Sequence, residues 1–265
     1  MIYGILLVYY EQYHARSVIE FQYLLNHLNQ KNKLIVVSNN PLISQSNSNY
    51  VLGDDLSSEF SGYDVGLKQI ENLTTEDYII FANDTFCHHR AWGKFEKKIF
   101  INKFQTAIKT QKKSIVGELN TFGKNFSIMG LQANEWISTY LFGMTSHFIE
   151  DLNQRLCIDP VSLIELVSID AYENFQWSGK LSNNLKTQLS SWLASNNKLG
   201  WYDKDANMQR RCNKAKSILN EFYLSAIAKK YGYELIDVYQ NLNLLDRAII
   251  FFKRLVRHIK LRYGF

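Results

Sequence analysis

Residues Asp77 to His89 read DYIIFANDTFCHH, and the predicted fold depends on this stretch. Tyr78 to Phe81 form an apolar run of strand length with side chains that favour β-structure. Asp84 follows shortly after, so a buried strand would end near a carboxylate. In open α/β sheets, ligands bind at the carboxyl edge of the strands. The alternative interpretation is an Asx turn that only begins the next helix.

The segments around this stretch alternate between strand and helix patterns. Continuous apolar runs predict buried strands, and apolar residues at helical spacing predict the helices between them. We therefore expect an α/β fold with a Rossmann-like, mostly parallel sheet flanked by helices, in which residues 1–117 form a nucleotide-binding half. The expected elements of this half are strands at 2–9, 34–37, 50–52, 78–81 and 114–116, and helices at 17–29 and 91–110.

Residues 118–243 change character and are expected to form a more helical half of the same domain. Helical spacing predicts helices over Trp136–Leu156, Val161–Val167, Leu185–Leu193 and Arg210–Tyr231. No linker composition separates the two halves.

Composition excludes several classes of protein. Hydrophobic residues make up 46% of the 265 residues, which is enough for a sizeable core, and the net charge is +5. Three widely spaced cysteines and the lack of a signal-peptide pattern predict a cytoplasmic protein with reduced thiols. No dinucleotide-binding, P-loop, serine-hydrolase or zinc-protease motif is present in the sequence.

The last 22 residues, 244–265, read LLDRAIIFFKRLVRHIKLRYGF and carry much of the positive charge. Apolar residues fall on one helical face and basic residues lie mainly opposite. This pattern is typical of an interfacial helix on an anionic membrane. The alternative is a final helix that packs on the protein core.

A resemblance appears in EFSGYDVG, residues 59–66, followed by DYIIFANDTF, residues 77–86. These segments resemble the GT-A nucleotide-sugar transferases, family-2-like enzymes that build O-antigen and capsule polysaccharides in bacteria. The resemblance implies a glycosyltransferase with a nucleotide-sugar donor and a lipid-linked glycan acceptor. It also implies a place at the inner face of the cell membrane, with residues 118–243 on the acceptor side.

The resemblance assigns Asp84 to a catalytic Mg²⁺ or Mn²⁺, or to the donor sugar. A metal held by a carboxylate stabilises the charge that builds on a diphosphate leaving group. His147 is a further metal candidate. Ala82 and Asn83 stand where an Asp-x-Asp motif has its first carboxylate, so a metal-independent enzyme remains open. Basic side chains would then stabilise the same charge. The candidates are Arg210, Arg211, Lys214 and Lys216 on or before one predicted helix, and Arg90 and Lys94 after Asp84.

Other donor contacts are inferred from the resemblance, because these residues occupy the same places in the order of strands and helices as the family's donor-binding residues. Strand ends in the family cradle the base and nucleoside, and the helix after them packs over the donor. Asp64 between two glycines suits a ribose or sugar hydroxyl, although the same segment could simply cap a helix. The predicted donor-binding set is Tyr9, Tyr10, Glu11, Ser38, Asn39, Gly62, Tyr63, Asp64, Asn83 and Thr85, besides the basic residues above.

An inverting transferase needs a general base for the acceptor hydroxyl. Asp170 and Glu173 are preferred because aromatic residues surround them in SIDAYENFQW, residues 168–177, and Glu221 and Glu135 are further candidates. Two other functions stay open: a non-catalytic protein that uses the GT-A fold as a scaffold, and a basic nucleic-acid-binding protein. The basic residues concentrate at one end and no nucleic-acid-binding signature occurs, so no nucleic-acid partner is expected.

Overall fold

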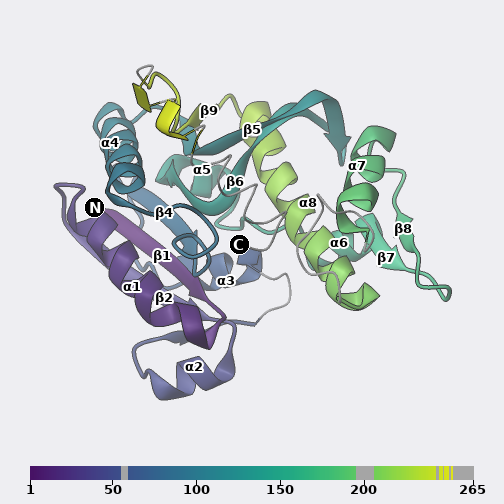
Figure 1. Cartoon of the computed structure of the whole chain (residues 1–265), viewed down its shortest axis with the longest axis horizontal. Helices are drawn as coiled ribbons and strands as arrows, with labels where there is room; N and C mark the ends of the chain where they lie inside the picture. The colour runs from purple at the N-terminus through teal and green to yellow at the C-terminus, as the bar shows by residue number, and fades with distance from the viewer. Residues whose placement is uncertain (55–58, 195–205, 243–244, 247, 251, 253–265) are drawn as a thin grey trace.

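A computed structural model describes residues 1–54, 59–194, 206–242, 245–246, 248–250 and 252 of the chain. The described residues form a seven-stranded sheet with helices on both faces (Figure 1). The expected α/β class and the mostly parallel sheet flanked by helices are therefore confirmed, and the sheet is compatible with a Rossmann-like fold.

The strand order is β3-β2-β1-β4-β6-β5-β9. Parallel pairing joins β1 (Ile2–Val8) to β2 (Asn32–Ser38) and β4 (Tyr78–Asn83), and β2 to β3 (Val51–Leu52). The next strand, β6 (Leu131–Thr145), is antiparallel to β4 and to β5 (Ser114–Ile128), whereas β9 (Glu234–Asp237) is parallel to β5. The strands β1 and β4 thus end side by side at one edge.

Alternate side chains of the strands enter two cores, one on each face of the sheet. Ile2 and Leu6 pack under α1 (Glu11–Asn26) and α4 (Lys94–Thr110). Ile5 and Leu7 pack on the other face under α3 (Glu59–Leu67), α5 (Ser146–Asp151) and the end of α8 (Met208–Lys230). Burial of both faces explains why these strands have continuous apolar sequences.

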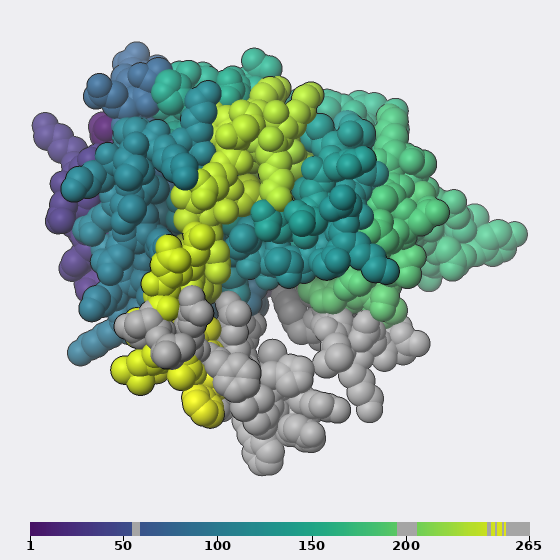
Figure 2. All heavy atoms as spheres, turned by 90° about the horizontal axis from the view of Figure 1, so that it is seen from above, coloured from purple at the N-terminus to yellow at the C-terminus, as the bar shows by residue number. Residues whose placement is uncertain are grey.

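A third core joins the far parts of β5 and β6 to α6 (Pro160–Leu166), α7 (Asn183–Leu193) and the middle of α8. The hairpin of β7 (Val167–Ile169) and β8 (Phe175–Trp177) stands beside α6 and projects from the body (Figures 1 and 2). The predicted helices at 161–167, 185–193 and 210–231 match α6, α7 and α8 closely.

The largest error of the sequence interpretation is the helix predicted over Trp136–Leu156. Residues up to Thr145 belong to β6, and only the short α5 follows. Residues 137–145 are buried without interruption, so this strand is covered on both faces. A strand buried on both faces is mostly apolar along its length instead of alternating, so its apolar residues can also fall at helical spacing.

Two smaller differences lie near the N-terminus. The helix expected at 17–29 begins earlier, because Glu11–Arg16 is the first part of α1. Ser17, the first residue of the expected helix, lies inside α1 and donates hydrogen bonds to the Tyr13 and His14 carbonyl oxygens. No element is predicted between residues 37 and 50, but α2 (Pro41–Ser46) lies there, and Asn40 caps it by accepting the amide of Leu42.

No helix among the described residues has the length and apolar character needed to cross a bilayer. Most of the predicted interfacial helix, residues 244–265, lies outside the described residues. Of the part that is described, Leu245 and Phe252 are exposed and Ile250 packs against the first core.

Candidate functional site

A cavity of about 1450 Å³ opens where β1 and β4 end. Its floor comes from these strand ends, and its walls come from the middle of β6, part of β5, and the facing sides of α7 and α8. Several residues predicted from sequence meet here: Tyr9, Tyr10, Asn39, Asn83, Asp84, Thr85, Arg210, Lys214 and Glu221.

Asp84 holds the floor together. Its side chain is buried, and its Oδ2 accepts hydrogen bonds from the backbone amides of Tyr9 at 2.8 Å and Tyr10 at 2.7 Å. These contacts join the end of β4 to the chain that leaves β1. Burial raises the pKa of Asp84 to about 6, although the two amide hydrogen bonds act in the opposite direction.

The neighbours of Asp84 shape the same floor. Thr85 donates its hydroxyl to Asn83 Oδ1 at 2.6 Å, which orders the turn after β4. Tyr9 stays 46% exposed at the mouth of the cavity, so its ring is accessible to a ligand.

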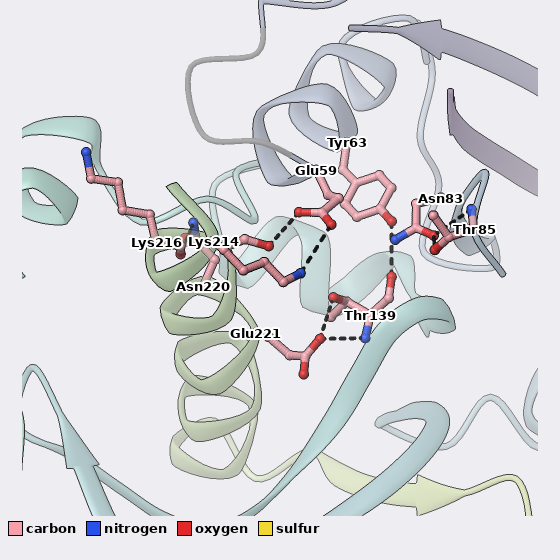
Figure 3. Close-up of polar contacts among 10 residues, drawn as sticks. Glu59, Tyr63, Asn83, Thr85, Thr139, Lys214, Lys216, Asn220 and Glu221 are labelled. Atoms are coloured by element: carbon pink, nitrogen blue, oxygen red, sulfur yellow. Dashed lines mark hydrogen bonds and ion pairs between the residues drawn. The ribbon is translucent and has the colours of Figure 1, made fainter. Parts of the chain in front are cut away.

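One side of α8 faces the cavity. Arg210, Lys214, Ser217 and Glu221 recur three or four residues apart, so they share one face of the helix. Ser217 donates its hydroxyl to Glu59 Oε2 at 2.5 Å, and Lys214 Nζ lies 3.9 Å from Glu59 Oε1 (Figure 3).

Two carboxyl groups in this cavity have pKa values shifted in opposite directions. Burial raises the pKa of Glu221, although its Oε2 accepts hydrogen bonds from the Thr139 amide at 2.9 Å and hydroxyl at 2.8 Å. Burial also acts to raise the pKa of Glu59, but Lys214 and Ser217 outweigh it and leave that pKa lowered. Oppositely shifted carboxyl groups in one cavity are typical of acid–base sites.

The loop after β4 adds His88, His89 and Arg90 to the wall. The guanidinium of Arg90 lies 4.7 Å from the ring centre of Tyr140, whose hydroxyl donates to Glu118 Oε2 at 2.8 Å. This packing orders a cation at the cavity surface.

Four predicted donor contacts have structural roles outside the cavity lining. Tyr63 is fully buried and donates its hydroxyl to the Thr139 carbonyl oxygen. Gly62 lets α3 approach β1, since a Cβ there would collide with Leu7. Asp64 accepts the amides of Leu156 at 2.7 Å and Cys157 at 3.3 Å, and thus fixes the segment after α5.

The fourth, Ser38, donates to the Asn40 carbonyl oxygen at the end of β2. Two further predicted residues lie at helix ends. Glu11 is exposed in the first turn of α1, and Arg211 donates to the carbonyl oxygens of Ala206 and Leu193, which ties α7 to the start of α8.

The preferred general bases lie on the projecting hairpin and not in the cavity. Asp170 accepts the amides of Tyr172 and Asn174, which lowers its pKa, and Glu173 sits in the turn with a φ of 59°. Their aromatic surroundings in the sequence are thus hairpin packing. Of the predicted bases, Glu221 lines the cavity.

The predicted metal ligands do not meet. Asp84 follows the carboxyl end of β4, whereas His147 follows Thr145, which pairs with Tyr78 at the opposite end of that strand. Within the described part of the chain, no cluster of three His, Cys, Asp or Glu side chains has the spacing of a metal site. Oδ2 of Asp84 binds two amides, and His147 lies at the other end of β4, so these two residues could not hold one metal ion together.

Sequence reasoning missed a large part of the wall. Thr139, Trp136 and Phe122 come from β6 and β5, and the helix predicted over 136–156 concealed the first two. Trp192 lies on a helix that was predicted, but no local signal says which of its faces meets a cavity. Glu59 was interpreted only as a helix-capping residue.

No protein-family model matches the chain, and neither does any curated protein.

Proposed function

We propose that the protein is a glycosyltransferase of the GT-A kind that moves a sugar from a nucleotide-sugar donor to a glycan hydroxyl. The observation that carries the proposal is the composition of one cavity. Its floor lies at the carboxyl ends of parallel strands, and the facing side of α8 presents cations beside a carboxyl group of raised pKa. The carboxyl edge of such sheets is a common place for nucleotides.

The donor would lie on the floor, with its diphosphate toward α8. Transfer breaks the bond between the anomeric carbon and a phosphate oxygen, and the electron pair leaves with the nucleoside diphosphate. Arg210 and Lys214 are placed to stabilise the charge that builds on those oxygens.

The acceptor hydroxyl forms the new bond to the anomeric carbon. In an inverting transfer, Glu221 would take its proton, since a carboxyl group of raised pKa is a better base than an ordinary one. Glu59 has a lowered pKa and stays ionised beside Lys214, so it would hold that cation in place.

The acceptor is proposed to be lipid-linked and the protein to act at the inner face of the membrane, as a step in O-antigen or capsule synthesis. The support is the basic, amphipathic sequence of residues 244–265. Removing residues 245–265 is expected to abolish binding to phosphatidylserine vesicles while binding of the donor persists. Unchanged vesicle binding would assign the tail to the protein core.

A thermal-shift screen against UDP-, GDP-, CMP- and dTDP-sugars tests the donor site. A ligand that binds the native state raises the unfolding midpoint, so one nucleotide is expected to give a clear shift. The screen is run with Mn²⁺ and with EDTA, and an equal shift in both supports donor binding through side chains. If no nucleotide shifts the folded protein, the donor site is refuted, and binding of RNA or a protein partner becomes the better hypothesis.

A further inference from the structure

One wall of the cavity consists of aromatic and amide side chains, which the proposed donor binding does not use. Gln188 and Trp192 lie one turn apart on α7, and both line the cavity. Gln188 is exposed, while Trp192 is partly buried against the third core. The α7 helix therefore places the ring of Trp192, held against the core, and the amide of Gln188 in the cavity lining.

Aromatic packing fixes the opposite part of this wall. Trp136 stacks on Phe222 with ring centres 4.5 Å apart and an interplanar angle of 23°. Phe122 meets Phe222 edge-on at 5.9 Å. These rings come from β6, α8 and β5, so three elements hold the surface rigid before any ligand arrives.

Amide side chains border the rings. Gln209 donates to Asn213 Oδ1 at 3.0 Å along the first turns of α8, and both residues line the cavity. An amide carries no charge and can both donate and accept hydrogen bonds, as a sugar hydroxyl does. The C–H face of a sugar ring is apolar and suits an aromatic ring.

We propose that this wall, formed by Phe122, Trp136, Gln188, Trp192, Gln209 and Asn213, is a binding subsite for an uncharged glycan. The inference rests on the proposed glycosyltransferase function and names its acceptor class. Sugar rings stack on Trp192, and the amides bind their hydroxyls. Glu221 and Phe222 both line the cavity, so a hydroxyl of a glycan bound at this wall would lie near the proposed base.

An array of immobilised oligosaccharides, some neutral and some bearing uronic acids, tests the subsite with the full chain. The wild type is expected to bind neutral members, and Trp192→Ala to bind them about tenfold more weakly, as truncation of a buried aromatic contact usually costs. Trp192→Phe retains a ring and should recover most of the binding. Trp177→Phe is the matched control. Trp177 lies on β8 and its Nε1 donates a hydrogen bond to Ser190 Oγ, and neither residue lines the cavity.

Gln188→Ala gives a second readout, since this exposed side chain can be removed without disturbing a core. This variant should bind neutral glycans more weakly than the wild type, so the subsite can be tested even if Trp192→Ala does not fold. Binding only of uronic-acid glycans would overturn the inference, and so would binding that neither variant weakens. A nucleotide-dependent thermal shift without any glycan binding would refute the subsite alone, whereas glycan binding without a nucleotide shift would refute the donor site alone.

Discussion

The floor and the α8 wall of the cavity are built in different ways. The floor consists of strand ends. Leu7 of β1 pairs with Asn83 of β4, and Asp84, the next residue, accepts the amides of Tyr9 and Tyr10, which lie two and three residues after Leu7. The wall forms because α8 packs against β6. For example, Glu221 on α8 accepts a hydrogen bond from the amide of Thr139 on β6, 82 positions away. Buried carboxyl groups occur in both regions. Asp84 in the floor binds backbone amides, whereas Glu221 in the wall is the general base of the proposed mechanism.

Replacing Glu221 by Gln should have the largest effect. The amide keeps an acceptor for Thr139 but cannot take a proton, so the transfer rate is expected to fall by about 10²–10⁴-fold. In the wild type, activity should rise with pH until Glu221 is ionised, at a pH above the ordinary range of a glutamate because burial raises its pKa. Initial rates against pH for both proteins provide the measurement.

Asp170→Asn is the matched control, because this carboxyl group lies on the projecting hairpin. It should leave the transfer rate and its pH profile as in the wild type. A Glu221→Gln enzyme with a normal rate would remove Glu221 from the mechanism, and an inactive Asp170→Asn enzyme would place the chemistry at the hairpin.

Asp84 and Asp64 both have raised pKa values, but only Asp84 lies in the floor of the cavity. Burial raises the pKa of each to about 6, above the unfolded value near 3.9. The native state thus binds more protons than the unfolded state between these values, so the free energy of unfolding falls as pH rises from about 4 to about 6. Each group contributes on the order of 1–3 kcal/mol to this fall.

Asp64→Asn and Asp84→Asn should each flatten the pH dependence of stability, measured by urea unfolding at pH 4.5 and 7. Only Asp84→Asn is expected to weaken nucleotide binding, since Asp84 shapes the floor and Asp64 binds the amides of Leu156 and Cys157. Equal effects on nucleotide binding would show that the floor is not the donor site.

The sequence predicted the floor better than the wall, for a physical reason. A buried strand followed by Asn83, Asp84 and Thr85 is a local pattern, and its place at the sheet edge follows from the parallel topology. Asp64 shows the limit of this reasoning: it lies on a predicted helix between two glycines, yet the glycines serve helix packing against β1 and β2 and the carboxylate serves a loop.

The wall depends on contacts between distant segments. The helix α8 was predicted well, and the spacing of Arg210, Lys214 and Glu221 places them on one face. No local pattern, however, says that this face meets β6, and β6 itself was predicted as a helix. The sequence therefore places the general base among the aromatic residues around Asp170, and it contains no local signal for the rings that line the cavity.

Replacing Lys214 should have the smallest effect of these changes. Lys214 lines the cavity and lies 3.9 Å from Glu59, whereas Lys216 on the same helix points away from this group (Figure 3). Lys214→Ala is expected to weaken binding of a nucleoside diphosphate by about tenfold, as loss of one charge-assisted contact does. Lys216→Ala removes the same charge and should leave binding unchanged, and calorimetric titration with UDP and GDP measures both.

The dependence of nucleotide binding on salt concentration distinguishes a direct contact by Lys214 from a general attraction by the net charge. A diffuse effect of net charge would weaken both variants equally and would vanish in concentrated salt, because exposed charges are screened within about 8 Å at physiological ionic strength. A direct contact in the cavity should leave Lys214→Ala weaker than Lys216→Ala even in high salt. Equal binding by the two variants would mean that the α8 face does not hold the diphosphate, and the donor would then have to lie against the loop of His88, His89 and Arg90, on the other side of the floor.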